Sequence, residues 1–143
     1  MVTVKIVRTD NKIQLPKYMT PGSAGADLMA ARDGYIDSGK TDLVPTGIKI
    51  QLPVGIEAQI RPRSGLAIKY GVTVINSPGT IDSDYRGEIM IGLINLSPNR
   101  FEFKKGDRIA QMILAKYEQA IFEETYRLDD TERGSGGFGH TGQ

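Results

Sequence analysis

The segment 63–65 has the chemistry of an anion-binding site. Arg63 carries a guanidinium with five N–H donors in a planar fork that fits a phosphate. Ser64 and Gly65 follow it at the predicted start of a short helix, where backbone N–H groups have no intrahelical partner. A hydroxyl, two amides and a guanidinium could therefore converge on one phosphate. A helix N-terminus beside a surface arginine explains the same residues equally well.

Two carboxylates could serve a reaction at such a phosphate. Asp82 ends a predicted β-hairpin at 71–82 and could orient a water as general base, and Asn76 adds a side-chain amide. The fixed amides and carbonyls of a hairpin edge could recognise a flat pyrimidine. Asp27 lies among small residues. Both acids also have a simpler interpretation, since Asp82 fits a hydrated turn and Asp27 a turn-capping acid.

The C-terminal segment has the composition of a lid. Arg133 and Phe138 lie among glycines, so a cation for developing phosphate charge and a ring that stacks on a base share a freely moving backbone. The single histidine, His140, has no second histidine or cysteine with which to bind a metal. A triad of Ser64, His140 and Asp82 would need a rigidly held base, so we expect neither a histidine metal site nor a triad.

Two matches to nucleotide-binding motifs are rejected on their context. Residues 34–41 satisfy the P-loop pattern letter for letter, but Pro45, Gly47 and alternating apolar residues follow where a P-loop needs a helix. Residues 134–139 fit the glycine pattern of dinucleotide-binding proteins without the βαβ unit that the pattern requires. We expect a solvated turn at the first place and part of the arm at the second.

The elements that must position these residues are short strands. Apolar and polar residues alternate with period two between turns rich in glycine and proline, which is typical of strands with one buried face. Clear examples are 2–7, 44–52, 56–60, 88–96 and 109–116. Only 64–70 favours a helix. This arrangement predicts an all-β, jelly-roll-like barrel or sandwich with one short helix.

The chain divides into one domain at 1–128 and an arm at 129–143. A length of 143 residues is typical of a single domain. From Asp129 onward the apolar pattern stops, and 133–139 contains too much glycine to hold one conformation. We therefore expect a flexible, glycine-rich C-terminal arm.

Composition excludes several classes of function. A net charge of +1, with acids and bases interspersed, gives no basic surface for a nucleic acid. No apolar run approaches the ~20 residues of a membrane span, and the first residues lack a signal-peptide pattern, so we expect a cytoplasmic protein with no membrane partner. The absence of cysteine excludes disulfides, thiolate metal sites and a cysteine nucleophile.

Five segments, in order along nearly the whole chain, resemble the five motifs of the trimeric dUTP pyrophosphatase (dUTPase) family. They are 24–28 (AGADL), 62–67 (PRSGLA), 79–88 (GTIDSDYRGE), 108–112 (RIAQM) and 133–142 (RGSGGFGHTG). The resemblance implies a jelly-roll-like homotrimer that uses Mg²⁺ to hydrolyse dUTP to dUMP and pyrophosphate, in active sites shared between subunits. Such an activity limits uracil incorporation into DNA and supplies dUMP for dTMP synthesis.

The resemblance also implies a role for each site residue. Asp82 would be the catalytic carboxylate that holds the 3′-hydroxyl and the attacking water, and Asp27 would hold Mg²⁺ through water molecules. One subunit would supply the nucleoside site, a second most phosphate ligands and a third the closing arm. The phosphate-binding residues would be Arg63, Ser64, Gly65, Gln111 and Arg133. The nucleoside-binding residues would be Asn76, Gly79, Ile81, Asp82, Tyr85, Met90, Phe138 and Gly139.

Two alternative functions stay open at this stage. A sister family with the same fold deaminates dCTP, and release of ammonia from dCTP would separate the two activities. From a different class, the fold could be a nucleotide-sensing or partner-binding module that has lost hydrolysis. The presence of Asp82, Gln111 and Arg133 argues against that loss.

Overall fold

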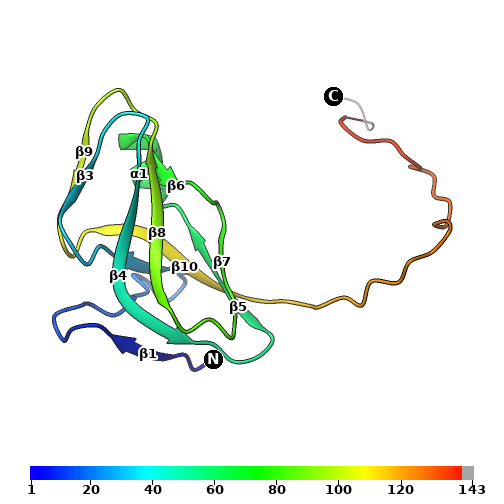
Figure 1. Cartoon of the computed structure of the whole chain (residues 1–143), viewed down its shortest axis with the longest axis horizontal. Coiled ribbons are helices and arrows are strands. Elements are labelled where there is room, and N and C mark those ends of the chain that lie inside the picture. Colours follow the sequence, from blue (N-terminus) through cyan, green and yellow to red (C-terminus); the bar gives the residue numbers. More distant parts are fainter. Residues whose placement is uncertain (140–143) are drawn as a thin grey trace.

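The computed structural model describes residues 1–139, whose body consists of short strands and one short helix (Figure 1). In chain order the elements are β1 (Lys5–Arg8), β2 (Ala26–Met29), β3 (Gly34–Ile36), β4 (Thr41–Gln51), β5 (Ile56–Arg61), α1 (Ser64–Tyr70), β6 (Val72–Val74), β7 (Gly79–Ile81), β8 (Glu88–Asn95), β9 (Phe101–Phe103) and β10 (Arg108–Lys116). The predicted all-β fold is confirmed, as are both limits of the predicted helix. No helix in 1–139 is long and apolar enough to cross a bilayer.

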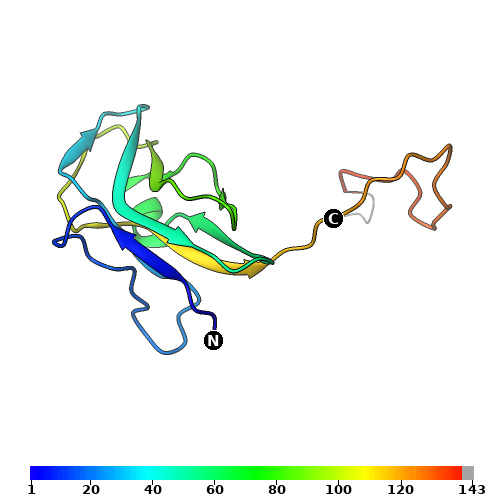
Figure 2. The same cartoon turned by 60° about the horizontal axis from the view of Figure 1, so that its bottom comes forward.

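Two antiparallel four-stranded sheets form a sandwich. One sheet has the order β1-β4-β8-β6 and the other β2-β10-β5-β7, while β3 and β9 form a separate two-stranded sheet. Neighbours within each large sheet are distant in sequence, so the chain crosses repeatedly from one sheet to the other, as in jelly rolls. Figure 2 shows the strands of the two layers from a second direction.

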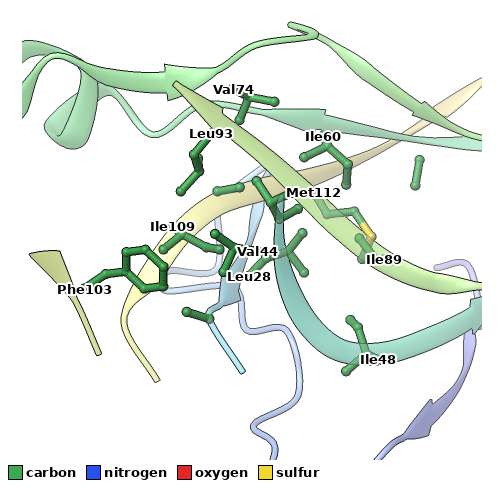
Figure 3. Close-up of a cluster of buried hydrophobic side chains, with 14 of the residues drawn as sticks. Leu28, Val44, Ile48, Ile60, Val74, Ile89, Leu93, Phe103, Ile109 and Met112 are labelled. Atoms are coloured by element: carbon green, nitrogen blue, oxygen red, sulfur yellow. The ribbon is translucent and has the colours of Figure 1, made fainter. Parts of the chain in front are cut away.

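The hydrophobic core lies between the two large sheets (Figure 3). Strand β8 alternates strictly, with Ile89, Ile91 and Leu93 buried and the residues between them turned outward. This is the period-two pattern expected of a strand with one buried face. The opposite sheet contributes Leu28, Ile60, Ile109 and Met112 to the same core.

Strand β4 is bent by an irregularity at 45–47. Its register with β8 shifts between Pro45 and Lys49, and Gly47 has a φ of +71°, which favours glycine. The Glu88 carboxylate accepts a hydrogen bond from the Gly47 N–H at 2.7 Å, and the Thr46 hydroxyl donates to a β8 carbonyl at 2.7 Å. Side chains thus replace the backbone bonds that the bulge interrupts.

The predicted hairpin at 71–82 is wrong. Strand β6 pairs with β8, whereas β7 pairs with β5, so the two strands belong to different sheets and 75–78 connects the layers. Alternation in the sequence identifies strands with one buried face, but it does not reveal their partners. The residues assigned to base recognition therefore lie on a crossover between sheets.

The rejection of a P-loop at 34–41 is confirmed. Thr41 begins a strand, and the preceding segment is a turn between β3 and β4. The Gly39 N–H donates to the Asn95 carbonyl at 2.7 Å, and the Lys40 N–H donates to the Asp37 carbonyl at 3.0 Å. These backbone donors are already bound within the protein and do not form a phosphate cradle.

After β10 the chain leaves the sandwich. Residues 118–139 contain no helix or strand, and Figures 1 and 2 show them running away from the sheets. The first part of this tail, 118–128, carries four large exposed apolar side chains: Ile121, Phe122, Tyr126 and Leu128. His140 lies outside the described residues.

Candidate functional site

The candidate phosphate-binding residues meet on three neighbouring strands. Gln111 on β10 is opposite Asp27 on β2 and also opposite Arg61 at the end of β5. Residues opposite each other on adjacent strands present their side chains on one face of the sheet. Because α1 begins three residues after β5 ends, Arg63 and Ser64 lie directly beyond this row.

Asp27 is a buried carboxylate held by two arginines. The residue is 8% exposed, its Oδ1 is 3.2 Å from Arg63 Nε, and its Oδ2 accepts a hydrogen bond from Arg108 Nη1 at 3.1 Å. Arg63 Nη1 also donates to the Arg108 carbonyl at 3.0 Å. The carboxylate offsets part of the positive charge and fixes both guanidinium groups, so cationic donors are oriented before any ligand binds.

An open cavity of about 570 Å³ lies against this cluster. It is lined by Met19, Ser23, Ala24, Gly25, Asp27, Arg61, Arg63, Ser64, Arg108, Gln111 and Ile113. Three arginines against one carboxylate give the cavity an excess of positive charge that favours an anion. No side chain caps the first turn of α1, so the N–H groups at Ser64 and the exposed Gly65 stay open to solvent or ligand.

The candidate nucleoside-binding residues surround the outer face of β8. The Asn76 amide packs against Gly79, its Nδ2 3.0 Å from the place of a Cβ there, and its oxygen lies beside Gly92 of β8. The Tyr85 hydroxyl donates to the carbonyl of the first residue of β8 at 2.9 Å. Met90 is exposed on the same strand. The structure therefore brings Asn76 together with Gly79 and places Tyr85 and Met90 on or against the same strand, β8.

Asp82 lies apart from the phosphate-binding cluster within one chain. Ile81, which is half-buried, pairs with Ala58, so Asp82 follows beside Glu57, and both acids line a second open cavity of about 500 Å³. The cluster begins at Arg61, four residues further along β5, or about 13 Å at the usual rise of a strand. A general base and its phosphate ligands must lie within a few ångströms of one phosphorus. One chain alone does not bring these groups together.

The candidate residues of the tail lie away from both groups. Arg133, Phe138 and Gly139 belong to the segment that Figure 1 shows extending from the sandwich. Arg133 Nε donates to the Gly136 carbonyl at 2.7 Å, and the Phe138 side chain is exposed. Their predicted contacts with a nucleotide would require the tail to fold back or to reach another subunit.

The ligand chemistry fits a magnesium ion held through water. Within 1–139 no group of three or more His, Asp and Glu side chains could bind a metal directly. Each oxygen of Asp27 contacts one arginine, which leaves acceptor capacity toward the cavity that it lines. Mg²⁺ usually keeps several waters and is bound through one or two carboxylates and the phosphates of a substrate. Asp27 fits that outer role and does not form a direct protein cage.

Two arginines of the cluster were missed by reasoning from the sequence. Arg108 lies three residues before Gln111 in one of the five motifs, and that position was the signal which could have identified it. Arg61 is opposite Gln111, and its Nη2 donates to Gln59 Oε1 at 2.5 Å. Both assignments depend on strand register, which sequence alternation does not fix.

In fold, the chain is similar to solved dUTPases. The dUTPase of Staphylococcus bacteriophage 80alpha with dUpNHpp superposes with a TM-score of 0.91 over 99% of each chain, at 20% identity. The dUTPase of Streptococcus mutans gives a TM-score of 0.75 at 31% identity, over 83% of this chain and 98% of that chain. The sandwich thus has the architecture of the dUTPase class.

Relatives found by sequence are more similar to this chain than the two solved structures are. The family model described as dUTPase matches residues 11–142. The deoxyuridine 5′-triphosphate nucleotidohydrolase of Rickettsia felis is 58% identical over 142 residues, covering 97% of this chain and 96% of that protein. The enzyme of the same description from Neorickettsia sennetsu is 57% identical over 132 residues, covering 91% and 89%. The chain belongs to the dUTPase family.

Proposed function

As a member of the dUTPase family, the chain hydrolyses dUTP to dUMP and pyrophosphate, and we propose that it does so in sites built between the subunits of a homotrimer. The observation that carries this proposal is the position of Asp82. It lies beside Glu57, about 13 Å along β5 from Arg61, where the candidate phosphate-binding cluster begins. A second chain must supply either Asp82 or the phosphate-binding cluster. The reaction limits uracil incorporation into DNA and supplies dUMP for dTMP synthesis.

The phosphate half of the site is the cavity around Asp27. Arg63 and Arg108 are held by this carboxylate at 3.2 and 3.1 Å, and Gln111 and Ser64 line the same cavity. With Gly65 they offer guanidinium, amide, hydroxyl and backbone donors to a triphosphate. Because these donors are already oriented, little ordering is needed when charge develops on the leaving pyrophosphate.

The proposed magnesium site is the same cavity around Asp27. When bound, Mg²⁺ neutralises phosphate charge and polarises the phosphoryl oxygens. Asp27 would hold the ion through its water shell, because the free acceptor positions of this carboxylate border the cavity and no direct cage is present in 1–139. Arg63 and Arg108 hold the carboxylate in place.

The nucleoside half lies around the outer face of β8. Asn76 and the backbone of 75–81 would hydrogen-bond uracil, and the closely packed crossover would clash with the 5-methyl group of thymine. Tyr85, fixed by its hydrogen bond to the start of β8, would pack against deoxyribose and leave no room for a 2′-hydroxyl. Gly79, Ile81 and Met90 would complete this surface.

Asp82 would be the general base. Its exposed carboxylate directly follows β7, the strand that carries Gly79 and Ile81, so it would reach the 3′-hydroxyl of the sugar and a water beside the α-phosphorus. The water attacks in line, the bond from phosphorus to the bridging oxygen breaks, and pyrophosphate leaves. No covalent intermediate with the protein is needed.

The tail would close over the nucleotide of a site formed by other subunits. Arg133 would contact the phosphates, and Phe138 with Gly139 would cover the uracil. The exposed apolar side chains of Ile121 and Phe122 support the association of chains, because their exposure to water is unfavourable and they do not pack on their own sandwich.

Release of pyrophosphate from dUTP in the presence of Mg²⁺ tests the proposed function. Rapid release from dUTP, with slow release from dTTP and UTP, is the expected result, because the crossover and Tyr85 exclude the added methyl and hydroxyl groups. dCTP is the control for the sister activity. Release of ammonia from dCTP, without pyrophosphate release from dUTP, would contradict the proposal.

A further inference from the structure

Gly25 lies directly beneath the side chain of Gln111. A Cβ at Gly25 would be 2.3 Å from Gln111 Oε1, 3.1 Å from its Cδ and 3.3 Å from its Cβ. The first of these distances is far shorter than any real carbon–oxygen contact, so the glutamine amide occupies space that only a glycine leaves free. We infer that Gly25 is a positioning residue for the Gln111 amide in the phosphate half of the site, an inference that rests on the proposed function.

The conformation of Gly25 does not itself require glycine. Gly25 is absent from the glycines with positive φ in 1–139, which include Gly39, Gly47 and Gly55. An alanine would therefore fit the backbone at position 25, and the three atoms nearest to its Cβ would all belong to the glutamine side chain. The need for glycine at this position is a need for space.

The Gln111 amide has a second contact that fixes its direction. Nε2 donates to the Pro62 carbonyl at 3.0 Å, immediately before the residues that open α1. The group carries two N–H donors, so one is used by Pro62 and the other remains for a ligand in the cavity that Gln111 and Gly25 both line. Packing on one side and a hydrogen bond on the other thus hold the amide in a single orientation.

A methyl group at position 25 would displace the amide and spare the fold. The closest clashing atom is the far end of a flexible side chain, so the amide can rotate away, and Gln111 Cβ at 3.3 Å needs to move only by a few tenths of an ångström. Rotation breaks the hydrogen bond from Nε2 to the Pro62 carbonyl and turns the second N–H of Nε2 away from the cavity. The backbone pairing of β2 with β10 does not involve this amide and stays intact.

The test is a double-mutant cycle of Gly25→Ala and Gln111→Ala, measured as kcat/KM for dUTP with saturating Mg²⁺. We expect each single variant to lose about tenfold, the usual effect of one misplaced hydrogen bond to a charged group. The double variant should be no slower than Gln111→Ala alone, because Gly25 acts through that side chain. Inhibition by deoxyuridine, which has no phosphate, and the thermal midpoint should stay at wild-type values.

Gly22→Ala is the matched control, because Gly22 is in the same loop, is exposed and has nothing within 4 Å of an added Cβ. Its kcat/KM should stay at the wild-type value. Wild-type activity of Gly25→Ala, or losses that multiply in the double variant, would overturn the inference while leaving Gln111 in its proposed role. Wild-type activity of Gln111→Ala would remove Gln111 from the phosphate site and the inference with it.

Discussion

At the scale of single residues, the charges around Asp27 organise the proposed phosphate half of the site. Asp27 is 8% exposed, and its carboxylate lies between Arg63 and Arg108 and holds both guanidinium groups. A buried carboxylate without these partners would be strongly disfavoured, and the arginines without it would repel each other. The same three groups therefore stabilise the fold locally and prepare the site for an anion.

Much of this cluster could be predicted from the sequence. Arg63, Ser64 and Gly65 were identified from the chemistry of a helix start, and Asp27 and Gln111 from the family motifs. Arg108 was missed, because its contact with Asp27 joins residues 81 positions apart and depends on how β10 pairs with β2. Such a contact is set by register, which local alternation does not determine.

The first prediction concerns Asp82. Asp82→Asn should bind dUTP with little loss, while kcat falls on the order of 10²-fold or more, because the amide cannot accept the proton of the attacking water. Steady-state kinetics together with binding of a non-hydrolysable dUTP analogue separates the two effects. Asp84→Asn, which removes a neighbouring exposed acid, is the control. A kcat for Asp82→Asn close to the wild-type value would remove Asp82 from the reaction.

At the scale of elements, alternating segments predicted most of the long strands, but β2 was not among the predicted strands. β8 alternates between buried and less buried positions throughout, and β5 and β10 do so over part of their length, which gives the pattern by which they were recognised. All four residues of β2 are buried, so this strand has no alternation to detect. The sequence also did not predict that β6 and β7 belong to different sheets, since each strand is only three residues long.

The bulge in β4 gives the second prediction. Gly47→Ala should destabilise the protein by roughly 2–3 kcal/mol, because φ is +71° and the new Cβ would lie 2.7 Å from the Ile13 side chain. Gly55→Ala is the matched control, since φ is +85° there but nothing lies within 4 Å of an added Cβ. It should cost about 1–2 kcal/mol from the backbone alone. Denaturant unfolding at equal protein concentration measures both, and equal losses would show that contact with Ile13 contributes nothing.

At the scale of the whole molecule, the two proposed halves of the site lie apart on the single chain. The tail adds a third part, because Arg133 and Phe138 lie on a segment that extends from the sandwich (Figure 1). Local sequence patterns do not reveal how subunits meet, so this arrangement could be expected only from the family resemblance. Asp82 lies beside Glu57, and the length of β5 from Glu57 to Arg61 gives the proposed shared site a physical basis.

The third prediction concerns the tail. Deleting 133–143 should leave the association state unchanged, because the apolar side chains at 121–128 remain, while kcat for dUTP falls at least about tenfold through loss of an arginine that offsets phosphate charge. Light scattering and steady-state kinetics measure the two properties. Arg127→Gln in the full chain is a control for charge elsewhere in the tail. Full-speed hydrolysis by the truncated chain would refute the proposed lid.

The central claim is that Asp82 of one subunit acts with Arg63 of another, and complementation tests it directly. Asp82→Asn and Arg63→Gln should each be nearly inactive alone. Co-expressed in equal amounts, they should regain about a quarter of wild-type activity, because about three-quarters of random trimers are mixed and each mixed trimer holds one intact site. Arg63→Gln mixed with Gln111→Ala is the matched control and should show no more than the mean activity of its two parents, since both changes lie in the same half. An equal mixture of Asp82→Asn and Arg63→Gln that stays as inactive as its parents, although mixed trimers are present, would contradict the shared site.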